Sequence, residues 1–99
     1  MVYGVNMLNY GDERAILNLL YSYAERIDAG DFDGVSNLFG EAPVFMAGPD
    51  QSAVPGAQVG AVLRHFVKTY DGIPRTKHLV TNTILEADSP AMVRTRSQF

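Results

Sequence analysis

Residues 11–33 read GDERAILNLLYSYAERIDAGDFD and contain the most regular pattern in the chain. Its apolar side chains recur at three- and four-residue steps, the spacing of one helix face; they are Ile16, Leu19, Leu20, Tyr23 and Ile27. This pattern predicts an amphipathic helix over residues 12–27, with Asp12 as its N-cap and Glu13 in the first turn, where the helix dipole favours an acid. Asp28 follows at the opposite end, where the dipole opposes a carboxylate. Its side chain is therefore either solvated or held there for a purpose.

A glycine corner separates this helix from a second, shorter one. Gly30 can adopt the left-handed conformation that ends a helix, and Asp31 is placed to cap the next helix, which we expect over residues 32–39. Gly40 ends that helix. The three aspartates of the corner lack the ligand spacing and the final glutamate of a calcium loop, so helix capping explains them better.

The middle of the chain alternates short apolar runs with breakers. Residues 42–47 (APVFMA) have the length and composition of a strand. The glycine- and proline-rich segment 48–60 is predicted to be a loop. A third helix is predicted over residues 57–70, because apolar residues again recur at helical steps and Gly72 and Pro74 follow.

From His78 onward the pattern changes to a period of two, which predicts a strand with His78 and Asn82 on the same face. A turn at residues 87–90 and a second alternating run at 91–99 complete a β-hairpin. We expect a second copy of the chain or further residues to pair with the last strand, because an unpaired edge exposes a row of backbone polar groups.

Composition excludes several classes of protein. The 99 residues are 46% hydrophobic and 19% charged, which is typical of one globular domain and not of a disordered chain. A net charge of −3 with scattered basic residues argues against nucleic-acid binding. There is no cysteine and no apolar run near the ~20 residues that cross a bilayer. The expectation is a cytoplasmic protein without membrane contact.

The order of these elements, with IDAGDFD at residues 27–33 and RTKHLVTN at 75–82, resembles the SnoaL-like group of the nuclear-transport-factor-2-like (NTF2-like) superfamily. Scytalone dehydratase, limonene epoxide hydrolase, ketosteroid isomerase and the β subunits of ring-hydroxylating dioxygenases share that fold. The resemblance implies an α+β, cone-shaped roll in which N-terminal helices pack on a curved, mostly antiparallel sheet around a pocket. Family members usually continue into further strands, so we expect residues 1–99 to form one SnoaL-like domain truncated at its C-terminal side.

In the dehydratase branch, an aspartate at the position of Asp28 orients a histidine at the position of His78, which acts as acid and base. An imidazole with a pKa of ~6.5 suits proton transfer at neutral pH. That branch also uses a second histidine on a later strand, which has no counterpart here, and a tyrosine whose place is taken by Ile27. The alternative is that Asp28 and His78 form a structural pair that docks helix to strand.

Four residues are further candidates for substrate binding: Tyr23, Asn82, Phe45 and Phe66. Tyr23 could instead be a core residue with its hydroxyl on a backbone acceptor, and Asn82 could merely hydrogen-bond a neighbouring group. His65 is expected at the surface, and no metal-ligand spacing is present, so no metal or cofactor is predicted.

Two functions follow. The first is a dehydratase-type lyase acting on a small hydroxylated aromatic or polycyclic compound. The isomerase branch is disfavoured, because it needs a carboxylate base that strand 42–47 lacks. The second is a non-catalytic subunit that binds a hydrophobic ligand or serves in assembly. In either case we expect a homodimer and a small hydrophobic ligand.

Overall fold

The computed structural model describes residues 9–45 and 53–98. Its elements in chain order are α1 (Tyr10–Asp28), α2 (Phe32–Phe39), β1 (Pro43–Phe45), β2 (Ala53–Pro55), the 3₁₀ turn η1 (Gly56–Gln58), α3 (Val59–Phe66), β3 (Thr81–Ser89) and β4 (Met92–Gln98). The strands form two antiparallel pairs, β1 with β2 and β3 with β4. This combination of helices and antiparallel strands confirms the α+β prediction.

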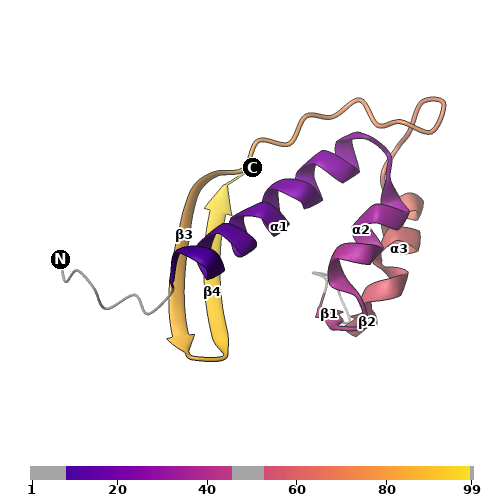
Figure 1. The fold of residues 1–99 in the computed structure, drawn as a ribbon. Coiled ribbons are helices and arrows are strands. Elements are labelled where there is room, and N and C mark those ends of the chain that lie inside the picture. Colours follow the sequence, from indigo (N-terminus) through magenta and orange to yellow (C-terminus); the bar gives the residue numbers. More distant parts are fainter. Residues whose placement is uncertain (1–8, 46–52, 99) are drawn as a thin grey trace.

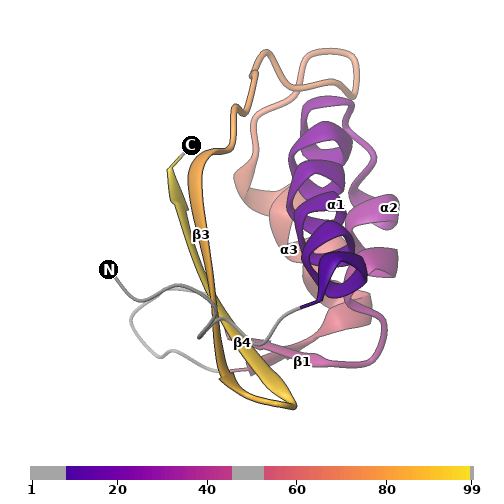
Figure 2. The same cartoon turned by 60° about the vertical axis from the view of Figure 1, so that its left-hand side comes forward.

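The long helix α1 connects the two ends of the molecule (Figure 1). Near its C-terminal end, α2 and α3 lie side by side, and the β3–β4 hairpin lies at its other end. Turning the molecule shows the hairpin on one side of α1 and α2 on the opposite side (Figure 2). The segment of residues 67–80 returns from α3, past the C-terminal end of α1, to β3 (Figure 1). None of the helices within the described ranges has the length and apolar content needed to cross a membrane.

The core lies where α1, α2 and α3 meet. Ile27, Val35 and Val59 are buried there, at 4%, 0% and 2% exposure. Partly buried apolar side chains pack around them; these are Tyr23, Phe39, Val44, Val54 and Leu63. Each core side chain stabilises the fold by roughly 1.5–3 kcal/mol relative to exposure. The predicted stripe of α1 therefore faces the core through its last turns.

The corner between α1 and α2 closes as predicted. Gly30 has φ of 75°, its N–H donates to the carbonyl of Ile27, and the N–H of Asp31 donates to the carbonyl of Arg26. These two bonds form the Schellman motif, in which a left-handed residue satisfies the last carbonyls of a helix. The Asp31 carboxylate then accepts from the N–H of Gly34 at 2.9 Å and caps α2.

The start of α1 corrects the predicted cap. Asn9, not Asp12, is the N-cap, and its side chain accepts from the N–H of Asp12 at 2.8 Å. The helix begins at Tyr10, so Asp12 lies inside the first turn. Its acid still lies where the dipole favours negative charge.

Two other boundaries also differ. The segment 48–60, predicted to be a loop, contains the strand β2, which pairs with β1, and the turn η1. Residues 48–52 of this segment lie outside the described ranges. Residues 46 and 47 of the predicted strand 42–47 also lie outside them. The third helix is α3, which ends at Phe66 and not at residue 70, because Val67 has extended backbone with ψ of 123°. Tyr70 instead pairs with Ile73 across a tight turn.

The hairpin is present, but its first strand begins at Thr81 and not at His78. Thr81 lies opposite Gln98 and Ile84 lies opposite Arg96, so β3 contains one more residue than β4 between these pairs. Asn82 lies in this bulge with φ of 55°. A bulge residue breaks the period of two, which is why the predicted alternation from His78 through Asn82 does not hold. The turn follows Ser89, later than predicted.

Candidate functional site

The path of residues 72–78 is set by a close approach of two glycines. At Gly30 there is no room for a Cβ atom, because the carbonyl of Gly72 occupies that space. Gly72 belongs to a tight turn in which Asp71 and Gly72 have φ of 54° and 84°. The chain then passes through the buried Pro74 and runs along the end of α1. Backbone packing thus brings the segment before β3 to the last residue of α1.

Asp28, Thr76 and His78 meet at this point. The backbone N–H of His78 donates to Asp28 Oδ2 at 2.6 Å, and His78 Nδ1 lies 2.6 Å from Asp28 Oδ1. The Thr76 hydroxyl donates to the same Oδ1 at 2.7 Å. The side chains of His78 and Asp28 are 28% and 16% exposed. The structure therefore brings together the two residues that the sequence singled out as a pair, and adds Thr76.

This environment keeps Asp28 ionised. Desolvation by burial raises the pKa of its carboxyl, but the hydrogen bonds from the backbone and ring of His78 and from Thr76 outweigh it and lower the pKa to about 2. A carboxylate that accepts several hydrogen bonds is stabilised in its charged form. Asp28 is therefore a fixed negative charge at neutral pH.

The contact with Asp28 also sets the state of the imidazole. In a neutral His78 that donates its Nδ1 proton to Asp28, the lone pair lies on Nε2. In that tautomer Nε2 is the ring nitrogen that can accept a proton.

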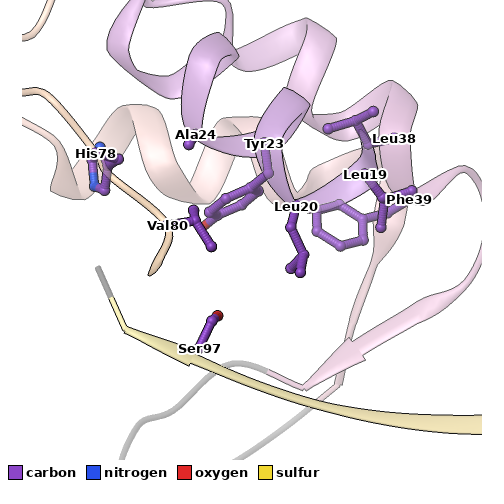
Figure 3. A pocket seen from close by; sticks show the side chains of 9 residues that line it. All are labelled: Leu19, Leu20, Tyr23, Ala24, Leu38, Phe39, His78, Val80 and Ser97. Carbon is purple, nitrogen blue, oxygen red and sulfur yellow. The ribbon is translucent and has the colours of Figure 1, made fainter. Parts of the chain in front are cut away.

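His78 forms part of the wall of a cavity of about 300 Å³ between the helices and the hairpin (Figure 3). Most of the lining is apolar and comes from Leu19, Leu20, Ala24, Leu38, Phe39 and Val80. Three lining residues carry polar atoms: Tyr23, His78 and Ser97. Figure 3 shows Tyr23, Leu20 and Phe39 extending from the helices toward Val80 and Ser97. An apolar cavity with a few polar groups is the usual form of a small-molecule site.

Tyr23 lies at the centre of this lining. Its ring contacts Phe39 edge to face, with 6.2 Å between centroids. Burial raises the pKa of its hydroxyl above the usual 10.0. The phenol is therefore protonated at neutral pH and can donate a hydrogen bond.

Three other predicted residues do not line this cavity. Phe45 and Phe66 are 73% and 77% exposed. The Asn82 amide donates to the side chain of Gln98 at 2.9 Å. Sequence reasoning gave no role to Ser97, although Leu19 and Leu20 already belonged to the predicted helix stripe. Within residues 9–45 and 53–98, no three His, Asp or Glu side chains gather in a way that could hold a metal ion.

The fold and the cavity define the class: an α+β pocket protein with helices on one side and antiparallel strands on the other. The sequence matches the SnoaL-like domain family over residues 10–99. The chain therefore belongs to the SnoaL-like family, and the resemblance seen in the two sequence motifs is confirmed. Comparison with curated proteins and with solved structures gave no match.

Proposed function

We propose that this protein is a dehydratase-type lyase that binds a small hydroxylated aromatic or polycyclic compound in the cavity beside Tyr23. SnoaL-like domains bind small ligands. The observation that supports a catalytic role is the Asp28–His78 contact of 2.6 Å at the wall of an apolar cavity. A general acid–base residue needs a defined tautomer and access to the ligand; the contact with Asp28 supports the first and the position at the cavity wall supports the second.

The chemistry uses His78 twice. Nε2 takes a proton from the carbon next to the hydroxyl-bearing carbon, and the C–H electron pair becomes a double bond. The hydroxyl group leaves as water by taking that proton from the imidazolium. Asp28 remains ionised throughout and stabilises the imidazolium, because its pKa is about 2. To the Tyr23 hydroxyl, protonated at neutral pH and part of the cavity lining, we assign the role of donor to an oxygen of the ligand.

A second candidate function is non-catalytic binding of a hydrophobic ligand, alone or within an assembly. The observation that favours it is the role of Asp28 in fixing the chain: the carboxylate accepts from the backbone of His78 and from Thr76 as well as contacting the ring. Such a network could serve only to dock the segment before β3 onto α1. The cavity would then hold a ligand without reacting with it.

His78→Asn separates the two functions. An asparagine amide can still donate to Asp28 in place of Nδ1, but it cannot exchange a proton at neutral pH. We expect the wild-type protein to convert members of a panel of hydroxylated polycyclic compounds, with water loss followed by mass spectrometry and the new double bond by absorbance. The variant should lose at least about a hundredfold in rate.

The matched control is His65→Asn, which changes an exposed histidine of α3. It should keep the wild-type rate. Ligand binding and thermal unfolding of both variants should stay near wild type. A wild-type protein that binds these compounds but converts none of them, or an unchanged rate in His78→Asn, would reject the lyase and leave the non-catalytic function.

We also propose that the protein forms a homodimer through the β3–β4 hairpin. Ile84 and Met92 are 47% and 61% exposed on it. Within the described part of the chain, β3 pairs with β4 and with no other strand. The outer edges of β3 and β4 therefore lack a strand partner there, and such edges favour pairing with another strand.

A further inference from the structure

A second hollow adjoins the first cavity at Tyr23 and His78. Its volume is about 460 Å³, and it shares both residues with the first cavity. Apolar side chains from α1 and α3 and from the residue after α3 contribute to its lining: Ile27, Leu63 and Val67. A ligand that contacts Tyr23 and His78 in the first cavity is therefore next to this second space.

The second hollow differs from the first in its charge. Its lining includes Lys68 and Arg75, which flank the ring of Tyr70. The guanidinium carbon of Arg75 lies 3.9 Å from the ring centroid, and Lys68 Nζ lies 5.4 Å from it. No carboxylate is among the residues that line this hollow.

These two cations have no acidic partner in the described ranges. The ion pairs found there join Arg64 to Asp33, Arg94 to Asp88, Arg96 to Glu86 and His78 to Asp28. The Asp28 carboxylate accepts from Thr76 and His78, which line this hollow. Both cations lie near the same ring, so an anion bound there would meet two positive charges.

The position of Arg75 suits it to bind such an anion. The guanidinium carbon lies over the Tyr70 ring, at a cation–π distance from its centroid. The N–H groups of a guanidinium lie in one plane and match two oxygens of a carboxylate or phosphate. Lys68, the second cationic side chain near the Tyr70 ring, can donate a further hydrogen bond to the same anion.

We propose that this hollow is the subsite for an anionic oxygen group of the ligand, held by Arg75 and Lys68, while the apolar body of the ligand lies beside Tyr23. The proposal rests on the proposed function in one respect, since both use the walls formed by Tyr23 and His78. It narrows the substrate class to apolar compounds that carry a carboxylate or a similar anionic group.

Two fluorescent probes with the same ring system test the proposal. Anilinonaphthalene sulfonate carries an anionic group, and phenylnaphthylamine lacks it. Both are titrated at low and high salt into the wild-type protein, the double variant Lys68→Gln/Arg75→Gln, and the control Arg14→Gln. Arg14 is exposed on α1 and lines neither hollow. Circular dichroism and thermal unfolding establish that each variant is folded.

We expect the sulfonate probe to bind the wild-type protein at least about tenfold more tightly than the neutral probe at low salt, since each charge-assisted contact is worth about that factor. The advantage should disappear in the double variant and shrink at high salt, but persist in Arg14→Gln. Competition by naphthoate or naphthyl phosphate better than by naphthol supports the subsite and tells carboxylate from phosphate.

Equal binding of the two probes to the wild-type protein, or an advantage that survives the double substitution, would overturn the proposal. If either of these results is found and the neutral probe still binds, the cavity beside Tyr23 remains supported as a ligand site and only the anionic subsite is rejected. If neither probe binds the wild-type protein, the proposed function fails together with the subsite.

Discussion

Asp28 has an unfavourable position for an acid in electrostatic terms, because it ends α1, where the carbonyl dipoles carry negative charge. Three hydrogen bonds from His78 and Thr76 offset this cost. The question raised by the sequence, whether this acid is solvated or held, is answered by those bonds. The Asp28 carboxylate is held by hydrogen bonds, and it connects the end of α1 to the segment that precedes β3.

The lowered pKa of Asp28 predicts how stability depends on pH. The carboxyl has its usual pKa of 3.8 in the unfolded chain and a pKa of about 2 in the folded protein. The stabilisation is therefore fully present above pH 4 and is lost as the pH falls from about 4 through about 2. After allowance for solvent screening, its size is about 1–2 kcal/mol.

Urea unfolding of the wild-type protein and of Asp28→Asn measures this effect. The variant should be less stable by about 1–2 kcal/mol at pH 7, and the gap should close near pH 2. Glu25→Gln, an exposed position on the same helix, should lie close to wild type at both pH values. A gap that is the same at both pH values would contradict the assignment.

At the residue scale, sequence reasoning reached Asp28, His78 and Tyr23 because each belongs to a motif or a periodic face. It did not give Thr76 a hydrogen-bonding role, because the segment between α3 and β3 has no period that fixes its path. Phe45 illustrates the opposite failure: its aromatic type suggested a ligand contact, yet it is 73% exposed, and nothing in a three-residue strand shows which face is covered.

At the scale of elements, α2 and α3 depend on one glycine for their close approach. Gly60 is buried, and a Cβ there would collide with the carbonyl of Phe32 and lie 2.6 Å from Ser36 Oγ. The N–H of Gly60 donates to that hydroxyl at 2.7 Å. Ser36 thus provides an acceptor for a donor in the first turn of α3.

Gly60→Ala should therefore destabilise the protein, although alanine is the better helix former by about 1 kcal/mol. Overpacking of two helices typically costs about 1–3 kcal/mol, and we expect a loss in this range by thermal or urea unfolding. Gly11→Ala makes the same change at an exposed position of α1, where the added Cβ would lie 3.3 Å from Asn9 Oδ1, and should cost less stability than Gly60→Ala. An unchanged or raised melting temperature in Gly60→Ala would contradict this account of the helix contact.

The helices were predictable as elements because periodicity and caps agree along α1 and α2. The strands were less so. The bulge at Asn82 depends on the pairing of Thr81 with Gln98 and of Ile84 with Arg96, and local patterns contain no information on that pairing. The short strand β2 was missed for a similar reason: Pro55 and its glycine neighbour indicate a loop, and only pairing with β1 makes this segment a strand.

At the scale of the whole molecule, the core and the hairpin are distinct. The residues of the buried core cluster, Ile27, Val35 and Val59, come from α1, α2 and α3, whereas neither β3 nor β4 contributes to that cluster. The cavity lies between these two parts, with α1 and α2 on one side and Val80 and Ser97 on the other. The position of the hairpin relative to α1 therefore sets the width of the site, and anything that holds the hairpin in place also shapes the site.

A second copy of the chain is suited to that task. The ion pairs of Arg94 with Asp88 and of Arg96 with Glu86 leave the hairpin with balanced charge, so two copies do not repel each other there. Ile84 and Met92 supply apolar contact area, and a two-fold axis makes one such surface complementary to itself.

We therefore expect sedimentation equilibrium at micromolar concentration to give twice the monomer mass of 10.8 kDa. Ile84→Glu/Met92→Glu should shift the protein to monomer, because charges buried in a contact of this kind cost several kcal/mol. Phe66→Glu, which changes a 77% exposed side chain on α3, should leave the dimer intact. A wild-type protein that sediments as a monomer, or a double variant that stays dimeric, would place the hairpin outside any contact between copies. In a dimer held by the hairpin, the double variant should also weaken binding of the neutral probe, because the wall that carries Val80 and Ser97 loses its support.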